Sequence, residues 1–482
     1  MKLSKMTKGV LATVAASSVM ATGLTAFLST AASASTTGST AAATAHRKYS
    51  SSAPLIIWNF KLSFNPGIEA VAAAFKAKTG ITVQTQIISG DAAYTQKTSA
   101  AASAHALPAL YIYWAGPESG AFDGEAIQWS SILNKDPAWK NSFLPAALAG
   151  VTVSKASLQS LKAPGSTADK WQLSRSPGQI YGIPIDVGGF ETILGNKSIL
   201  ERAGISTSKP PANMEAWMAD MNKVKAKTGI PGLVFSGNEF TLYENWMATF
   251  VDYMKTGPQS FAQFMEGKQG MYPNHMDIPN FIQWLNHTGN YLPGAVNMAI
   301  NTADAQFAQG RAAYDLGGSF TYSNLIAMGM NPKNIVSFRV PALANSKLPN
   351  AKVTPFPLVE ANVLKGPQEA QAIEFVKFLT SQQGQILYAN HASDLPAVKI
   401  TNPRLLSPTL KTIDSMFSSK PSWWSENQTT EGLVGTQPWL VFQHDMELML
   451  LGKMTAKQTA IQFDQAEAKF VQAAAKIAKG GH

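Results

Sequence analysis

Residues 55–87 constrain the fold more than any other part of this sequence, because strand and helix patterns alternate there within a short length. A continuous apolar run at 55–58 is typical of a strand covered on both faces. Ile68, Val71 and Phe75 follow at helical spacing, and the helix pattern stops at a Lys-Thr-Gly sequence. Alternating apolar and polar residues then indicate a second strand. Such a β-α-β unit predicts parallel strands with helices on the faces of the sheet, which is an α/β fold.

Later segments repeat this alternation. Apolar runs at 110–114 and 233–235 predict further buried strands, and Asn213 can cap a helix that extends to about residue 227. Thr455 and Gln458 form a capping-box pair at the start of the last helix. With 482 residues, the chain is long enough for two or three domains.

The composition excludes several classes of protein. Charged residues make up only 14% of the chain, where about 25% is typical of soluble proteins. Aromatic residues reach 10%, which argues against an intrinsically disordered chain. No internal apolar stretch is long enough for a multispan membrane protein. The absence of cysteine excludes a disulfide scaffold, thiol catalysis, iron–sulfur clusters and Cys-ligated zinc.

The N-terminus has the three zones of a secretory signal peptide over residues 1–34. Three lysines precede an apolar run over 10–27, and a small-x-small cleavage site follows at 32–34. We therefore expect an exported protein, periplasmic or at the cell surface. A lipoprotein would need a cysteine at the cleavage point, so no lipid anchor is expected. Residues 35–53, rich in Ser, Thr and Ala, are expected to form a flexible tether.

The net charge of +9 does not indicate a nucleic-acid partner. Three of the lysines belong to the predicted leader, and the densest later group (Lys223, Lys225 and Lys227) alternates along an expected helix surface. Nucleic-acid binders instead concentrate basic charge in a patch. We expect a monomer that binds no nucleic acid.

No motif of a known catalytic chemistry is present. The sequence has no phosphate loop, dinucleotide fingerprint, nucleophile elbow or HExxH pair, and its seven histidines lack metal-ligand spacing. We therefore expect no catalytic residue, no cofactor and no metal. A secreted glycan-active enzyme stays open as an alternative, because its two carboxylates need only meet in space. Candidate pairs are Asp186 with Glu191, and Glu239 with Glu244.

Aromatic and amide residues collect where the predicted strands end. In α/β sheets, ligands bind at the carboxyl ends of the strands. Sugars suit aromatic surroundings, because their C–H faces pack on flat rings while their hydroxyls need amide and carboxylate partners. The residues in these positions are Trp58, Phe60, Lys61, Trp114, Glu118, Glu239, Phe240, Tyr243, Trp246, Phe320 and Tyr322.

Several segments follow the patterns of one protein family. Residues 75–83 read Phe-Lys-Ala-Lys-Thr-Gly-Ile-Thr-Val after a strand and a helix, 178–184 follow G-x-x-Y-G-x-P, and 307–313 follow F-x-x-G-x-A-A. A late helix pattern comes at 378–385. This ordered set covers nearly the whole mature chain. It resembles the extracellular solute-binding proteins of ABC transporters, in the sugar-binding branch to which maltose-binding protein belongs.

The resemblance implies a fold and a mechanism. The fold would be that of periplasmic binding proteins: two interleaved α/β lobes with a hinge and a central ligand cleft. One lobe would comprise residues 54–185 plus 360–410, and the other 186–359 plus 411–482. The protein would capture a sugar or oligosaccharide by hinge closure and deliver it to an ABC transporter permease.

The resemblance also implies ligand-binding positions. Trp114 and Trp439 match aromatics of the family that stack on sugars, Phe320 stands where a stacking Trp is frequent, and Phe240 or Tyr243 would stack beside the carboxylate Glu239. Polar contacts would come from the remaining positions: Glu118, Gln443 and Lys61.

A third hypothesis is that the protein has the same fold but binds an anion or a metal ion instead of a sugar. Such a site should concentrate Arg, Lys, His or Tyr at the strand ends. Among the cleft candidates only Lys61 is cationic, so a neutral sugar is favoured.

Overall fold

A computed structural model describes residues 53–116, 124–160, 170–238, 242, 247–265, 267–418 and 437–478. These residues belong to one compact unit, Arg47–His482. Three sheets and their covering helices form a mixed α/β structure, as predicted. The predicted leader, and all of the predicted tether except Ala53, lie outside the described residues.

The predicted β-α-β unit forms one side of a five-stranded sheet. β1 (Leu55–Asn59) pairs in parallel with β2 (Val83–Ile87) and with β3 (Leu110–Trp114), which confirms the predicted parallel pairing. β11 (Val359–Val363) pairs antiparallel with β3 and with β4 (Ile183–Pro184), giving the order β2-β1-β3-β11-β4.

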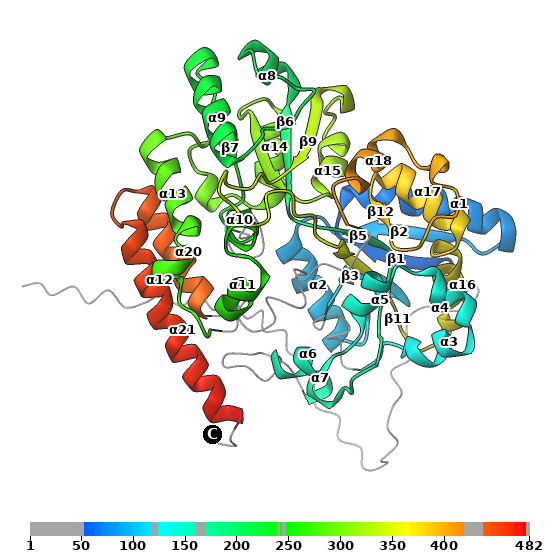
Figure 1. The fold of residues 1–482 in the computed structure, drawn as a ribbon. Coiled ribbons are helices and arrows are strands. Elements are labelled where there is room, and N and C mark those ends of the chain that lie inside the picture. Colours follow the sequence, from blue (N-terminus) through cyan, green and yellow to red (C-terminus); the bar gives the residue numbers. More distant parts are fainter. Residues whose placement is uncertain are drawn as a thin grey trace, which may run out of the picture. The chain divides into compact units, whose positions relative to one another are not determined.

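Three helices that pack together cover part of this sheet (Figure 1). They are α1 (Asn65–Thr79), which contacts β2, α16 (Glu369–Leu379), which contacts β11, and α17 (Gln382–Ala392), which packs on α1. Gly80 ends α1 with φ of 78°, a left-handed conformation that glycine adopts without a steric penalty. The predicted helix stop is therefore confirmed.

A second, four-stranded sheet has the order β7-β8-β6-β9. Its strands are β7 (Leu233–Val234), β8 (Tyr314–Gly317), β6 (Thr192–Asn196) and β9 (Ile335–Arg339). Around it lie α8 (Lys197–Arg202), α9 (Met214–Thr228), α14 (Ile300–Ala308) and α15 (Thr321–Ala327). Asn213 caps α9 by accepting a hydrogen bond from the Ala216 amide at 2.8 Å, as predicted.

A short three-stranded sheet links the other two. β5 (Asp186–Gly188) pairs antiparallel with both β10 (Phe356–Pro357) and β12 (Leu395–Pro396). β5 follows β4 of the five-stranded sheet and precedes β6 of the four-stranded sheet, so the chain crosses from one sheet to the other there. It returns through β10 into β11. We call this element the linking sheet.

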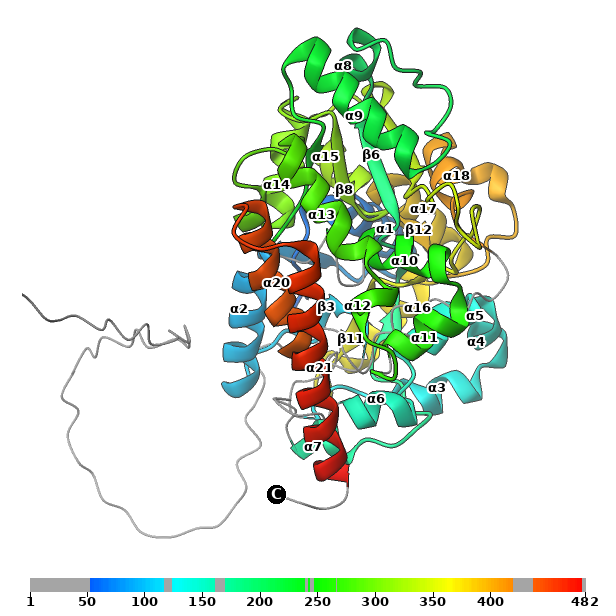
Figure 2. The ribbon, with the colours of Figure 1, turned by 60° about the vertical axis from the view of Figure 1, so that its left-hand side comes forward.

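The C-terminal helices pack against helices from the segment between β7 and β8 of the four-stranded sheet. α20 (Gln437–Leu450) and α21 (Ala456–Ala478) pack on each other and on α12 (Met271–Asn274) and α13 (Asp277–Thr288), as both views show (Figures 1 and 2). Thr455 and Gln458 cap α21 reciprocally: each backbone amide donates to the other residue's side-chain oxygen, at 3.0 and 3.3 Å. The predicted capping box is confirmed.

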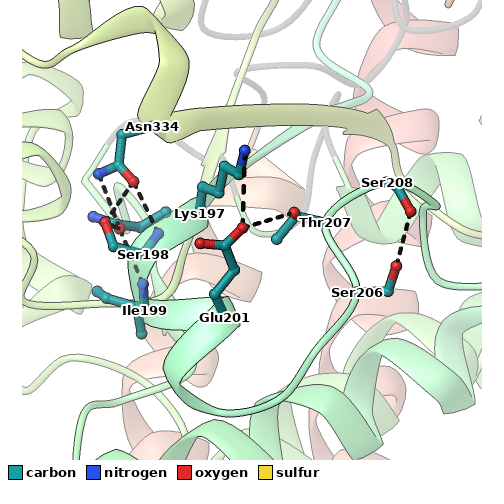
Figure 3. A network of polar contacts seen from close by, with 9 residues as sticks. Lys197, Ser198, Ile199, Glu201, Ser206, Thr207, Ser208 and Asn334 are labelled. Atoms are coloured by element: carbon teal, nitrogen blue, oxygen red, sulfur yellow. Dashed lines mark hydrogen bonds and ion pairs between the residues drawn. The ribbon is translucent and has the colours of Figure 1, made fainter.

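A network of exposed polar contacts fixes the turn from β6 into α8 (Figure 3). The Asn334 side-chain oxygen accepts a hydrogen bond from the Ser198 amide at 2.8 Å, and Lys197 lies 3.8 Å from Glu201. Thr207 donates to the same Glu201 carboxylate at 3.5 Å. Exposed ion pairs of this kind contribute little to stability, so we assign the network a local role in holding the turn.

No described helix is long and apolar enough to cross a membrane. The remaining helical segments complete the described structure. They are η1 (Leu62–Phe64), α2 (Asp91–Ser103), α3 (Trp129–Lys135), α4 (Pro137–Ser142), α5 (Pro145–Val151), α6 (Lys155–Ser160), α7 (Lys170–Ser174), α10 (Met247–Thr256), α11 (Pro258–Met265), η2 (Ala295–Asn297), η3 (Pro332–Asn334), η4 (Pro403–Leu405) and α18 (Pro408–Asp414).

Candidate functional site

The carboxyl ends of β1 and β3 place two aromatic rings side by side. The Phe60 ring centroid lies 4.2 Å from that of Trp114, with an interplanar angle of 34°. The rings of Tyr94 and Tyr113 also contact the Trp114 ring, at centroid distances of 6.0 and 4.8 Å. Trp114 is nevertheless only half-buried. Its ring is therefore fixed in position and partly exposed at the sheet edge where ligands of α/β proteins bind.

The structure brings Lys61 and Phe320 together from different sheets. Lys61 follows β1, and Phe320 follows β8. The Lys61 ammonium lies 3.9 Å from the centroid of the Phe320 ring, which is a cation–π contact. The Phe320 side chain is 4% exposed, so little of its ring is open to a ligand in this arrangement.

Gly318 makes room for the Phe320 ring. A Cβ atom at position 318 would lie 2.2 Å from Cε1 of Phe320, closer than non-bonded carbon atoms approach. Any other residue at 318 would therefore displace the ring. Tyr322, which follows in α15, is buried, and its hydroxyl lies 3.1 Å from the Thr409 hydroxyl of α18. In this structure that hydroxyl ties two helices together.

Trp439 has no exposed surface in this structure. Its ring packs against Phe264, Phe442 and Phe463, at centroid distances of 6.4, 5.6 and 4.9 Å. The expected stacking on a sugar would require the ring to leave this core. Gln443, one turn later in α20, is half-buried, and its amide donates to the Gly237 carbonyl at 3.4 Å.

Four of the predicted site residues lie outside the described residues. They are Glu118, Glu239, Phe240 and Tyr243, and Glu244 of the alternative carboxylate pair lies outside as well. The residues before two of these segments are well anchored. The Ala115 amide donates to the Leu358 carbonyl at 3.0 Å, and the Asn238 amide donates to the Met298 carbonyl at 3.2 Å.

Two buried carboxyl groups in and beside the linking sheet were not identified from the sequence as a pair. Asp186 accepts a hydrogen bond from the Val359 amide at 3.0 Å and another from the Tyr388 hydroxyl at 3.3 Å. Burial raises the pKa of Asp186 and that of Asp394, the charge of Asp186 raises the pKa of Asp394 further, and the Lys61 ammonium lowers both. No sequence periodicity could reveal this pair, because strands of two or three residues carry none.

Glu191 is a third buried carboxyl group, at the start of the four-stranded sheet. It is fully buried, and neither of its carboxyl oxygens has a hydrogen-bond partner in any other described residue. Burial raises its pKa to about 8, although its own backbone amide and the nearby Arg339 charge act in the opposite direction. Asp186 and Glu191, one of the two pairs considered for a glycan-active enzyme, are thus both closed off from a substrate in this structure.

A buried histidine pairs with a carboxylate on the side of α20 and α21. His275 Nδ1 lies 2.6 Å from Asp252 Oδ2, both side chains are fully buried, and Phe264 stacks on the imidazole at 4.4 Å. The other imidazole nitrogen, Nε2, and the other carboxylate oxygen, Oδ1, have no hydrogen-bond partner among the described residues. Nor do the described residues include a cluster of three or more His, Asp or Glu side chains that could hold a metal ion.

Solved structures show the same fold over nearly the whole chain. A chitin oligosaccharide binding protein is 18% identical with a TM-score of 0.63, covering 87% of this chain and 99% of its own. A maltose-bound protein of T. maritima is 15% identical with a TM-score of 0.62, covering 86% and 99%. A protein from work on xylan utilisation by the thermophilic bacterium Caldanaerobius polysaccharolyticus is 18% identical with a TM-score of 0.65, covering 86% and 99%. At such identities the likeness is one of fold, and it confirms the predicted periplasmic-binding-protein fold.

The family follows from the sequence itself. Residues 70–411, well over half of the chain, match the family model described as bacterial extracellular solute-binding protein. No curated protein sequence matches the chain. Proteins of this family, like the structural neighbours, bind solutes rather than transform them. The chain belongs to the family of bacterial extracellular solute-binding proteins.

Proposed function

We propose that this protein captures an uncharged sugar or oligosaccharide outside the cytoplasm and delivers it to the permease of an ABC transporter, without chemical change to the sugar. The observation that supports this most directly is the Trp114 ring, held by Phe60 yet half-exposed at the end of β3. A fixed, partly open indole suits the C–H face of a sugar ring.

The identity of the ligand class rests on two further observations. Solved neighbours of the same fold carry descriptions that name chitin oligosaccharide, maltose and raffinose. The chain has an unusually low share of charged residues, 14%, which suits a receptor for neutral ligands. A receptor that must release its ligand to a permease should bind at about micromolar strength, near −8 kcal/mol.

The proposal includes the lobes and the site. One lobe would be 54–185 plus 360–410 and the other 186–359 plus 411–482, with the linking sheet as the hinge between them. The binding residues would be Lys61, Trp114, Glu118, Glu239, Phe240, Tyr243, Phe320, Tyr322, Trp439 and Gln443. Residues 1–34 would direct export, and the mature protein would act as a monomer.

Thermal unfolding against a panel of mono- and oligosaccharides tests the proposal, with chromatography of the sugar after incubation. A sugar at a hundredfold excess over its dissociation constant should stabilise the folded state by about 2.7 kcal/mol. Trp114→Ala should abolish that shift. Trp284→Ala is the matched control, because Trp284 is also half-buried against a phenylalanine, Phe281 at 5.6 Å, but lies in α13.

The other outcomes identify the alternatives. Breakdown of the sugar that stops in a Glu239→Gln variant would establish a glycan-active enzyme instead. A shift with phosphate or a metal ion, and with no sugar, would establish a receptor for another solute. Equal loss of the sugar shift in the Trp114 and Trp284 variants would reject the site.

A further inference from the structure

Lys61 connects the two larger sheets through its charge. Its ammonium lies 3.9 Å from the centroid of Phe320, the residue that follows the four-stranded sheet's β8. The rings of Phe60 and Phe64, from its own side, lie at 5.8 Å. A cation within about 6 Å of a ring is attracted to the negative face of that ring. Lys61 thus sits among three rings, one of which belongs to the other sheet.

Both partners of this contact are attached to packed elements. Lys61 immediately precedes η1, and η1 packs against α15, whose first turn follows Phe320. Phe320 is 4% exposed, and Phe190 holds it in an edge contact at 6.1 Å. The backbones that carry the ammonium and the ring are therefore anchored on both sides, and only the Lys61 side chain itself has to be ordered to make the contact.

Two carboxyl groups in and beside the linking sheet also interact electrostatically with the Lys61 ammonium. The Lys61 charge lowers the pKa values of Asp186 and Asp394, which burial raises. Asp186 lies in β5, the strand that runs directly between the two larger sheets. Lys61 is half-buried, so water screens its charge less there than in bulk solvent. This strengthens both the cation–π contact with Phe320 and the interaction with the carboxyl groups.

We propose that Lys61 is a latch between the five-stranded and four-stranded sheets, which holds the two sheets in the arrangement seen here. The inference rests on the hinge of the proposed function, but it concerns the protein before any ligand binds. Loss of the latch should favour arrangements in which the two sheets stand further apart. Because affinity scales with the fraction of molecules in the competent arrangement, the latch would also tune ligand binding.

The chain offers a clean way to measure this separation. It contains no cysteine, so Lys76→Cys and Lys227→Cys would introduce the only two thiols for spin labels. Lys76 is exposed on α1 and Lys227 is exposed on α9, so the labels report on the two sheets separately. Pulsed electron–electron double resonance on protein that has been dialysed free of ligand gives the distribution of distances between the two labels.

Lys61→Met keeps an unbranched stem and removes the charge. The ratio of molecules at the original label distance to those at longer distances should fall roughly fivefold, from the usual strength of one cation–π contact. Lys61→Arg keeps a cation and should retain the original distribution. Phe320→Leu removes the ring from the other side and should give the same shift as Lys61→Met. It also provides a second test should one of the two variants fold poorly.

Lys97→Met is the matched control. The Lys97 ammonium lies 4.7 Å from the Trp58 ring, and both residues belong to the side of the five-stranded sheet. Its loss should leave the distances unchanged. An unchanged distribution in Lys61→Met and Phe320→Leu would overturn the latch, and so would an equal shift in Lys97→Met. Failure of every sugar to bind would refute the proposed function and would leave these ligand-free distances fully interpretable.

Discussion

Replacing Glu191 by Gln should make the protein more stable at alkaline pH while changing it little in acid. Glu191 is fully buried, and neither carboxyl oxygen has a hydrogen-bond partner in any other described residue. Burial raises its pKa from an ordinary 4.5 to about 8. The folded protein therefore holds a proton on this carboxyl group over a pH range in which the unfolded chain has lost it.

The sign and size of the effect follow from proton linkage. Between pH 4.5 and about 8 the folded state binds more protons at this site than the unfolded state, so the free energy of unfolding falls as the pH rises. The loss is about 1.4 kcal/mol per pH unit. It reaches about 3 kcal/mol at pH 7 and about 5 kcal/mol above pH 8, where it levels off. Gln has nearly the same shape and does not titrate, so the variant escapes this loss.

Urea unfolding monitored by tryptophan fluorescence at pH 5, 7 and 8.5 would measure the effect. The difference in unfolding free energy between the variant and the parent should grow in favour of Glu191→Gln across this range. Glu374→Gln, which makes the same change at an exposed position on α16, is the control and should show no such growth. A Glu191→Gln difference that stays constant from pH 5 to pH 8.5 would refute the reasoning from burial.

Three further substitutions test local features. Gly318→Ala should lower the free energy of unfolding by about 1–3 kcal/mol in urea titrations, because its Cβ would lie 2.2 Å from the Phe320 ring; unchanged stability would mean that the ring moves freely. Thr455→Ala removes one half of the capping box of α21 and should cost about 1 kcal/mol by the same measurement, with Thr412→Ala, inside α18, as a comparison outside any cap. Phe463→Ala empties a fully buried site between Trp439 and Phe264 and should cost about 3–5 kcal/mol, whereas a loss below 1 kcal/mol would show that this part of the core is loosely packed.

The sequence predicted those parts of the fold that are long and locally determined. β1, α1 and β2 were identifiable because every residue of β1 is buried and Gly80 takes the left-handed conformation that ends the helix. The caps at Asn213 and Thr455 were identifiable because the bonded groups are three residues apart. Such patterns depend on neighbours in sequence, and they can be read without the fold.

The linking sheet and the environment of single side chains could not be predicted in this way. Strands of two or three residues have no periodicity, so the burial of Asp394 beside Asp186 depends on pairings between distant segments. Trp439 illustrates the same limit: its place in α20 was compatible with stacking on a ligand. Its ring is instead enclosed by Phe442 of the same helix and by Phe264 and Phe463 of two other helices. The contact between Lys61 and Phe320 likewise depends on two sheets that only the folded chain brings together.

The position of β11 inside the five-stranded sheet has a consequence for the order in which the chain folds. β11 lies between β3 and β4, and its Val363 pairs with Leu110, whose strand is formed from a much earlier part of the chain. The five-stranded sheet, which begins at residue 55, thus cannot be completed until the segment that forms the four-stranded sheet has been synthesised and β11 has followed it. Pairings of such long range make folding slow. Slow folding would leave a newly made chain without its completed sheet, and so with the edges of β3 and β4 unpaired, for longer after synthesis.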